Sequence, residues 1–272
     1  MGLVPEEVYN EQARTNTASG IPFIEVVKAH DIPLAVVGGG PSVGKHLDEL
    51  REWPGHIWAI NQGASWFSHF MPEKLVWMFT VDPDHELAKP QWTAGVERAI
   101  LGITVSPKLV EALKGKDVKF FNPHEAPENE FHLAGGPSSV CRTFIPAICL
   151  GYKNVTYFGC EGSINVRRIG NSNQYSVEAT HSYRKESRPR QMIVKCGDEE
   201  FVSTPDLYLT TRTLAKIIQE YPLALSEKSG GLLRGMLEHP DTWEVVAYSE
   251  ALAQCIAPSV ISPENRYERK AA

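Results

Sequence analysis

The chain has no apolar run long enough to cross a membrane, and it carries little excess charge of either sign. Of its 272 residues, 42% are hydrophobic and 22% are charged, and the formal net charge is −6. A weakly negative chain is not drawn to nucleic acid or anionic lipid by bulk electrostatics. Residues 1–20 are too polar for a signal peptide. We therefore expect a globular cytoplasmic protein with no membrane span.

Cysteine is also scarce, and its spacing excludes two common uses. The five cysteines form no C-x-x-C pair; they are Cys141, Cys149, Cys160, Cys196 and Cys255. This pattern supports neither a zinc site nor a disulfide framework, and it favours reduced thiols. Internal repeats and low-complexity tracts are absent as well.

The first 160 residues instead alternate between strand-like and helix-like segments. The expected strands are 34–38, 56–61, 75–81, 99–105, 118–122 and 155–159. The expected helices are 43–53, 62–70, 107–114 and 139–150. This alternation predicts a three-layer α/β fold, with a mostly parallel sheet and helices on both faces. Such sheets bind ligands beyond the carboxyl ends of their strands.

The pattern changes after Gly159. Residues 161–190 are rich in polar residues with little periodicity, which predicts a long loop or lid. A β-hairpin is expected over 192–203, a helix over 205–221 and a last helical turn over 231–237. We expect one domain over residues 1–256, with the lid near 161–190, and a C-terminal extension over 257–272.

The turn after the first expected strand is the strongest functional signal. There an apolar run meets Gly38, Gly39, Gly40, Pro41 and Ser42, and a helix-like segment follows. Glycines let a phosphate approach backbone amides, and a helix dipole favours the anion. An ordinary strand-to-helix turn remains the alternative. The pattern matches neither G-x-x-x-x-G-K-[ST] nor G-x-G-x-x-G, so it predicts a nucleotide site of a less common kind.

Polar residues follow three other expected strands. Asn61 and Gln62 end the second strand, Asp82 and Asp84 follow the third, and Glu161 and Gly162 follow the sixth. An amide or a carboxylate at such an edge can bind a base, a ribose or a metal, although each can also cap a turn. Asp82 and Asp84 with Glu86 form a D-x-D-x-E cluster that fits Mg²⁺ or Mn²⁺.

Two further features fall later in the chain. Ser138 and Ser139 close a second Gly-Pro-Ser turn, which is either another phosphate contact or a helix cap. His181 lies in the polar stretch 161–190, where arginines also gather. A histidine there can act as a general base, although most loop histidines are simply solvated.

Three blocks of the chain together carry a family resemblance. Val36 to Val43, Ala59 to Asn61 and Val81-Asp82 resemble a Rossmann-like family containing archaeal 6-hydroxymethylpterin diphosphokinases and motility-associated glycosyltransferase-like proteins, with bacteriophage members. A second set of blocks, Gly136 to Val140, Ile148 to Val155 and Gly159 to Glu161, is similar to the same family. This second set also resembles a bacterial sialyltransferase family of related fold.

The resemblance implies a nucleotide-binding transferase. By analogy with the sialyltransferases, Gly40, Ser42, Asn61, Ser138 and Ser139 would contact the nucleotide, and His181 would be the base. The chain departs from the family in having Cys160-Glu161 where an aspartate is usual.

The function that we expect is transfer of a sugar from a nucleotide-sugar to a hydroxyl acceptor, a small molecule or a glycan. One alternative is diphosphate transfer from ATP to a pterin-like hydroxymethyl group, with Asp82 in the catalytic machinery. Another is a catalytically inactive nucleotide-binding or interaction module. The sequence leaves open whether the chain forms a homo-oligomer.

Overall fold

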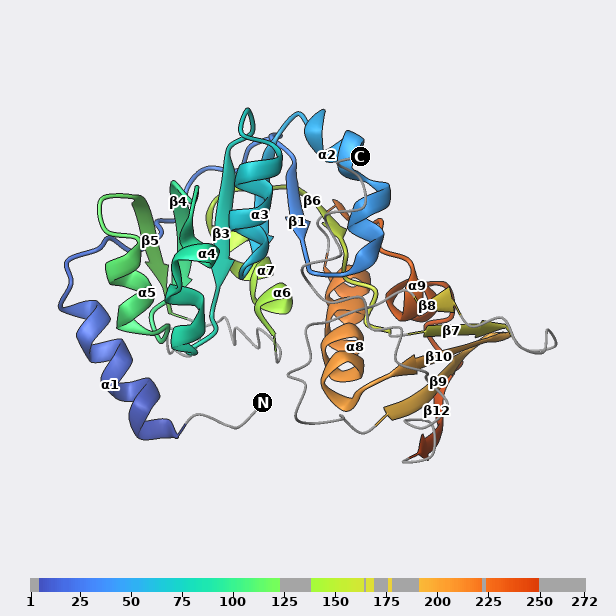
Figure 1. The fold of residues 1–272 in the computed structure, drawn as a ribbon. Coiled ribbons are helices and arrows are strands. Elements are labelled where there is room, and N and C mark those ends of the chain that lie inside the picture. Colours follow the sequence, from blue (N-terminus) through green and yellow to red (C-terminus); the bar gives the residue numbers. More distant parts are fainter. Residues whose placement is uncertain are drawn as a thin grey trace. The chain divides into compact units, whose positions relative to one another are not determined.

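The computed structural model describes residues 5–122, 138–163, 165–168, 176–177, 191–221 and 224–249 (Figure 1). These residues form two compact units, which are treated separately below. Unit 1 contains residues 1–38, 46–157 and 221–226, and unit 2 contains residues 39–45, 158–220 and 227–272. The predicted extension over 257–272 lies outside the described residues.

Unit 1 is built on a seven-stranded sheet in the order β11-β6-β1-β2-β3-β4-β5. Its strands are β1 (Leu34–Val37), β2 (His56–Ile60), β3 (Val76–Thr80), β4 (Arg98–Gly102), β5 (Asp117–Phe121), β6 (Asn154–Phe158) and β11 (Ala224–Glu227). Each neighbouring pair from β1 to β5 is parallel, so the sheet is mostly parallel, as the sequence predicts. The six strands expected from the apolar runs are all present, each within a few residues of its expected bounds.

The strand order contains a topological switch point. The chain moves outward from β1 to β5 and then returns to place β6 on the other side of β1. Because crossovers between parallel strands are right-handed, the outward and returning connections place their helices on opposite faces. Ligands of such sheets bind where the order reverses, beside the carboxyl ends of β1 and β6.

The helices of unit 1 cover both faces of this sheet. They are α1 (Glu6–Thr17), α2 (Leu47–Arg51), α3 (Gly63–Phe70), α4 (Pro90–Thr93), α5 (Pro107–Ala112), α6 (Ser139–Arg142) and α7 (Phe144–Cys149), with a 3₁₀ turn η2 (His85–Ala88). All side chains of β1 are fully buried, and Trp58 of β2 stacks on Phe79 of β3. Strands covered on both faces need continuous apolar runs, which is why the sequence signal was clear.

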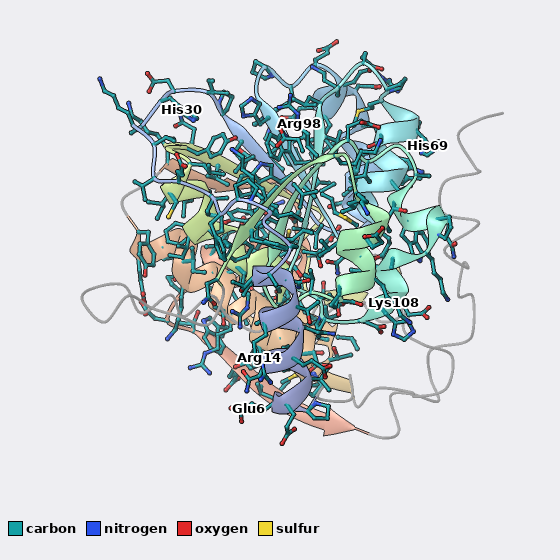
Figure 2. All side chains as sticks on the ribbon, turned by 90° about the vertical axis from the view of Figure 1, so that its left-hand side faces the viewer. Glu6, Arg14, His30, His69, Arg98 and Lys108 are labelled. Atoms are coloured by element: carbon teal, nitrogen blue, oxygen red, sulfur yellow. The ribbon has the colours of Figure 1, made fainter. Side chains whose placement is uncertain are left out.

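Helix α1 is an addition to the sequence prediction. Glu6 lies in its first turn and Arg14 in its last, which suits the helix dipole (Figure 2). The buried Asn16 donates through Nδ2 to the carbonyls of Ile103 and Val105, each at 2.8 Å. These two bonds fasten the helix end to the loop that follows β4.

An extended segment, residues 21–33, connects α1 to β1. It pairs with Phe120 near the carboxyl end of β5 and then reaches the amino ends of β6 and β2. His30 Nε2 donates to the Leu150 carbonyl, 2.9 Å away, and its ring meets Tyr152 edge-on. The Tyr152 hydroxyl lies 2.6 Å from His56 Nδ1. His30 and Arg98 mark this end of unit 1 in Figure 2, with α1 at the opposite end.

Unit 2 contains a second, five-stranded sheet in the order β12-β9-β10-β7-β8. Its elements are the 3₁₀ turn η1 (Pro41–Lys45), β7 (Asn165–Arg168), β8 (Ser176–Val177), β9 (Gln191–Cys196), β10 (Glu199–Ser203), α8 (Pro205–Glu220), α9 (Gly231–Glu238) and β12 (Trp243–Ser249). The expected hairpin is confirmed, because β9 and β10 pair antiparallel.

Three sequence predictions need correction. Strands β7 and β8 lie in the stretch 161–190, which was predicted to be a loop; β7 pairs with β10, so partners distant in sequence create it. The expected helix 43–53 is divided into η1 and α2, and 139–150 is divided into α6 and α7.

Within the described residues, no helix is long and apolar enough to span a bilayer.

Candidate functional site

Two loops of unit 2, each continuing along the chain from a strand beside the switch point, contact each other. The first, residues 39–45, continues from β1, and the second, residues 158–163, continues from β6. The Gly40 amide donates to the Gly159 carbonyl at 2.9 Å. The Ser42 amide donates to Glu161 Oε1 at 2.6 Å. Gly40, Ser42 and Glu161, which the sequence predicted separately as site residues, are therefore brought together where these two loops meet.

Gly40 is required by this contact between the loops. A Cβ at position 40 would overlap the Glu161 carboxylate and would lie 2.7 Å from the Gly159 carbonyl oxygen. A Cβ at Gly39 would meet nothing within 4 Å, and that residue is exposed. The close approach of the Gly159 carbonyl and the Glu161 carboxylate thus explains the glycine at position 40. Within the residues that the structure describes, no such contact explains the glycine at position 39.

The Glu161 loop is held firmly from its other side. Glu161 is only 2% exposed, and its carbonyl accepts the Leu233 amide of α9 at 3.1 Å. Ser163 Oγ accepts the Leu232 amide at 3.3 Å, so the loop satisfies the first amides of α9. Ser203 Oγ donates to the Gly162 carbonyl at 2.6 Å. The carboxylate is therefore presented to Ser42 by a loop with few degrees of freedom.

Gly162 has a structural reason of its own. Its φ of +65° lies in the left-handed region, and a Cβ there would lie 2.8 Å from Thr211 Cβ on α8. The predicted role of Gly162 in nucleotide binding is not required to explain the glycine.

The electrostatics of this turn differ from those of a bare phosphate loop. The Ser42 amide, which a phosphate would use, already donates to a buried carboxylate. A phosphate approaching that same amide would meet a negative charge at short range, and such repulsion is strong away from bulk water. The Ser42 hydroxyl is buried and has no hydrogen-bond partner in the described part of the chain. A buried hydroxyl in this state is costly, so a partner from outside these residues would stabilise it.

Unit 1 brings together a second set of predicted residues. Asn61 follows β2 with a φ of +52°, a left-handed conformation that asparagine adopts more readily than most residues. Ser139 Oγ donates to Asn61 Oδ1 at 3.4 Å and accepts the Val81 amide at 3.3 Å. The loops after β2 and β3 are thus joined to the start of α6 by one buried hydroxyl.

Asp82 and Asp84 cap turns after β3. Asp82 Oδ1 accepts the Asp84 amide, and Asp84 Oδ1 accepts the Glu86 amide, each at 3.0 Å, so Asp84 is the N-cap of η2. Among the residues described, no group of three or more His, Cys, Asp or Glu is arranged to hold a metal ion. A divalent cation here would have to complete its shell with ligand phosphates or water. The metal role of Asp82 and Asp84 stays a prediction.

The remaining predicted residues have simple positions. Gly38 follows β1 directly, Gln62 precedes α3, and Ser138 precedes α6 with its hydroxyl 3.6 Å from Cys141 Sγ. Pro41 begins η1. His181 and the glycines of the second Gly-Pro-Ser turn lie outside the described residues. The predicted base and the second phosphate contact therefore stay predictions.

Sequence reasoning missed the residues that position the Glu161 loop. Ser163, Ser203 and Thr211 are buried, and each contacts this loop or the glycine within it. Ser203 and Thr204 directly precede the proline that opens α8, which is a usual place for polar residues. Polar residues before this proline indicate where α8 starts, but they do not indicate that Ser203 contacts the Glu161 loop.

Comparison with known proteins gives one likeness of fold. No family model matches the chain, and no curated protein matches it. A solved structure described as a MAf glycosyltransferase from Magnetospirillum magneticum AMB-1 is similar, with a TM-score of 0.58 and 15% sequence identity. The match covers 85% of this chain and 38% of that one. The chain thus spans well under half the length of the glycosyltransferase, and the likeness shows the fold alone.

Proposed function

We propose that this chain is a transferase of the glycosyltransferase type that takes a nucleotide-activated donor. The carrying observation is the joined pair of loops after β1 and β6, where the buried Ser42 hydroxyl lacks a partner among the described residues. The fold shared with a glycosyltransferase supports the same choice. The donor is a nucleotide-sugar in this proposal, and ATP is the alternative if the reaction is diphosphate transfer.

The position of Glu161 suggests how a nucleotide would be oriented. Its carboxylate would repel phosphate at the Ser42 amide, and in this proposal it accepts hydrogen bonds from ribose hydroxyls or base amino groups. The exposed side of the turn at Gly39 has room for a phosphate beside the backbone. In the proposed arrangement the nucleoside faces Glu161 and the phosphates face Gly39. The sequence-based roles of Asn61 and Ser139 as nucleotide contacts, and of His181 as the acceptor's base, stay predictions.

The donor is tested by a thermal-shift panel of CMP, UDP, GDP and ATP, each with Mg²⁺ and with EDTA. A ligand at 100 times its Kd stabilises the folded state by about 2.7 kcal/mol, which a melting curve resolves. A CMP, UDP or GDP shift supports the glycosyltransferase proposal, and an ATP shift that needs Mg²⁺ supports the diphosphokinase. If no nucleotide shifts the melting temperature, the proposal fails.

The site is tested by Gly39→Val, with Gly44→Ala as its matched control. Both glycines lie in residues 39–45 with nothing within 4 Å of an added Cβ, and neither has a positive φ. A valine at 39 should block phosphate approach and raise the nucleotide Kd at least about tenfold, a loss of about 1.4 kcal/mol. The control should bind like the wild type in calorimetric titration. Equal affinity in both variants would remove this turn from the proposal.

A further inference from the structure

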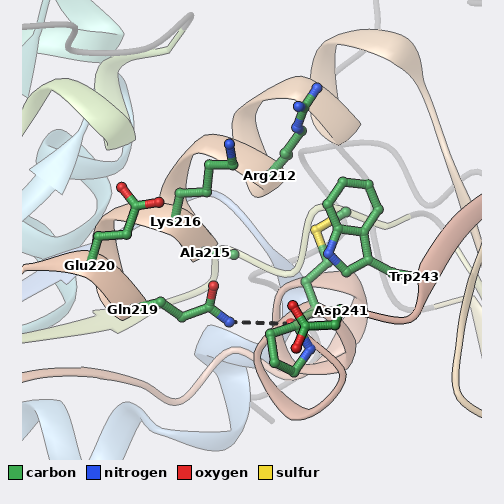
Figure 3. A pocket seen from close by; sticks show the side chains of 9 residues that line it. Arg212, Ala215, Lys216, Gln219, Glu220, Asp241 and Trp243 are labelled. Atoms are coloured by element: carbon green, nitrogen blue, oxygen red, sulfur yellow. Dashed lines mark hydrogen bonds between the residues drawn. The ribbon is translucent and has the colours of Figure 1, made fainter.

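A separate pocket of about 200 Å³ lies in unit 2 beside α8, the end of α9 and the start of β12 (Figure 3). None of its lining residues belongs to the two loops that carry the proposed nucleotide site. Its apolar lining consists of Ala215, Met236, Pro240 and Trp243. The volume is well below the roughly 300–1,000 Å³ of usual drug-sized sites, so a single small ring is the largest ligand that it would enclose.

Helix α8 provides the polar side of this pocket through its spacing. Arg212, Lys216 and Glu220 are four residues apart, so they share one face of the helix, and Gln219 lies beside them. The inward face is formed by Leu214, Ala215 and other buried residues. Gln219 Nε2 donates to the Met236 carbonyl at 3.5 Å, which joins α8 to the end of α9.

Trp243 forms the aromatic side of the pocket, opposite Lys216 and Glu220 in Figure 3. The Arg212 guanidinium lies 5.8 Å from the centre of the indole ring, and Tyr208 meets the ring edge-on at 5.9 Å. These contacts fix the indole, which remains only half-buried. A partly exposed, oriented aromatic ring is a typical binding platform for a ligand with one apolar face.

The charged groups of the pocket are mixed in sign and do not pair with one another. Two cations, Arg212 and Lys216, and two carboxylates, Glu220 and Asp241, line it. Within the described residues, none of these four makes an ion pair with another charged side chain. The formal charges cancel, so the pocket selects neither an anion nor a cation. It offers hydrogen-bond donors and acceptors around an indole instead.

We propose that this pocket binds a neutral saccharide ring. Sugar hydroxyls both donate and accept, so they can satisfy the carboxylates and the cations at once, while the C–H groups of the ring pack against Trp243. A neutral monosaccharide also fits the pocket's size and zero net charge. This site is independent of the proposed nucleotide site, and it holds whether or not the chain transfers sugars.

The test is saturation-transfer NMR on the full chain with glucose, galactose and N-acetylglucosamine at millimolar concentration. We expect saturation of the ring C–H protons of at least one sugar. Lys216→Ala and Asp241→Ala, both at exposed positions, should each weaken that sugar about tenfold, since a hydrogen bond to a charged group is lost. Trp243→Leu should abolish the signal. Arg234→Ala is the control, because Arg234 lies on α9 outside the pocket and pairs with Glu238.

The outcomes separate this proposal from the nucleotide proposal. Nucleotide binding is measured on the same samples, and it should be unchanged in Lys216→Ala and Asp241→Ala. Absence of saturation for all three sugars would overturn the pocket proposal, as would a signal that survives in both exposed variants. Loss of nucleotide binding with retained sugar binding would overturn only the nucleotide proposal. Because Trp243 also packs on Tyr208, its variant is interpreted only with an unchanged circular dichroism spectrum.

Discussion

Neighbouring glycines in the turn after β1 are explained by different physical causes. Gly40 contacts the Gly159 carbonyl and the Glu161 carboxylate, whereas Gly39 is exposed and an added Cβ there would meet nothing within 4 Å. The sequence pattern identified both as ligand-binding glycines, because a glycine run does not reveal which glycine is needed for the chain's own packing. Glu161, separated by more than a hundred residues, supplies the missing information.

This difference gives a prediction about stability. Gly40→Ala should lower the free energy of unfolding by about 1–3 kcal/mol, because the added methyl overlaps buried groups that cannot move away cheaply. Gly39→Ala, its matched control, should be neutral or slightly stabilising, since its φ is not positive and alanine restricts the unfolded chain. Urea unfolding of the two variants measures both effects. A stable Gly40→Ala protein would show that the loops after β1 and β6 are not packed together.

At the scale of elements, a small group of titratable side chains gathers where the end of the extended segment 21–33 meets the amino ends of β2 and β6. Partial burial lowers the pKa of His56, and nearby His30 and Arg98 lower it further. Burial raises the pKa of Tyr152 to about 12, so its hydroxyl stays neutral beside His56. The neutral hydroxyl can bond either form of His56, so the lowered pKa comes from burial and the neighbouring charges rather than from this contact.

The pH dependence of this contact follows from the sign of the shift. The unfolded chain binds a proton at His56 near pH 6.5, and the folded chain binds it only at lower pH. The contribution of His56 is therefore complete above pH 6.5 and is lost as the pH falls toward its lowered folded-state pKa. His56→Gln keeps a hydrogen-bonding side chain at Tyr152 but cannot titrate. Urea unfolding between pH 5.5 and 7.5 should show a smaller loss of stability in this variant than in the wild type, and equal losses would contradict the assignment.

The elements also show what sequence could predict and what it could not. Six strands of the seven-stranded sheet are mainly apolar segments ended by glycine or polar residues, so they were predictable locally, whereas the short, half-exposed β11 was not predicted. Strands β7 and β8 were not, because β7 forms by pairing with the distant β10, and β8 forms by pairing with β7. Asn61 and Ser139 were predicted as site residues, but their mutual contact depends on the strand order, which local patterns do not determine.

At the scale of the whole molecule, the two units are interleaved along the chain. The chain passes from one unit to the other after residues 38, 45, 157, 220 and 226. Residues 39–45 belong to unit 2, although both of their ends continue into elements of unit 1. Unfolding of unit 1 would release both ends of this segment, and the ordered contact between Ser42 and Glu161 would then cost much more conformational entropy.

The interleaving predicts that the two units unfold together. Tryptophan provides a selective probe, because Trp243 lies in unit 2 and the other five, Trp53, Trp58, Trp66, Trp77 and Trp92, lie in unit 1. In Trp243→Phe, fluorescence therefore reports unit 1 alone, whereas far-ultraviolet circular dichroism reports the helices and strands of both units. We expect the two urea transitions to have the same midpoint, as a single cooperative system requires. Separate midpoints would instead show that each unit is stable without the other, and that the segment 39–45 does not couple their folding.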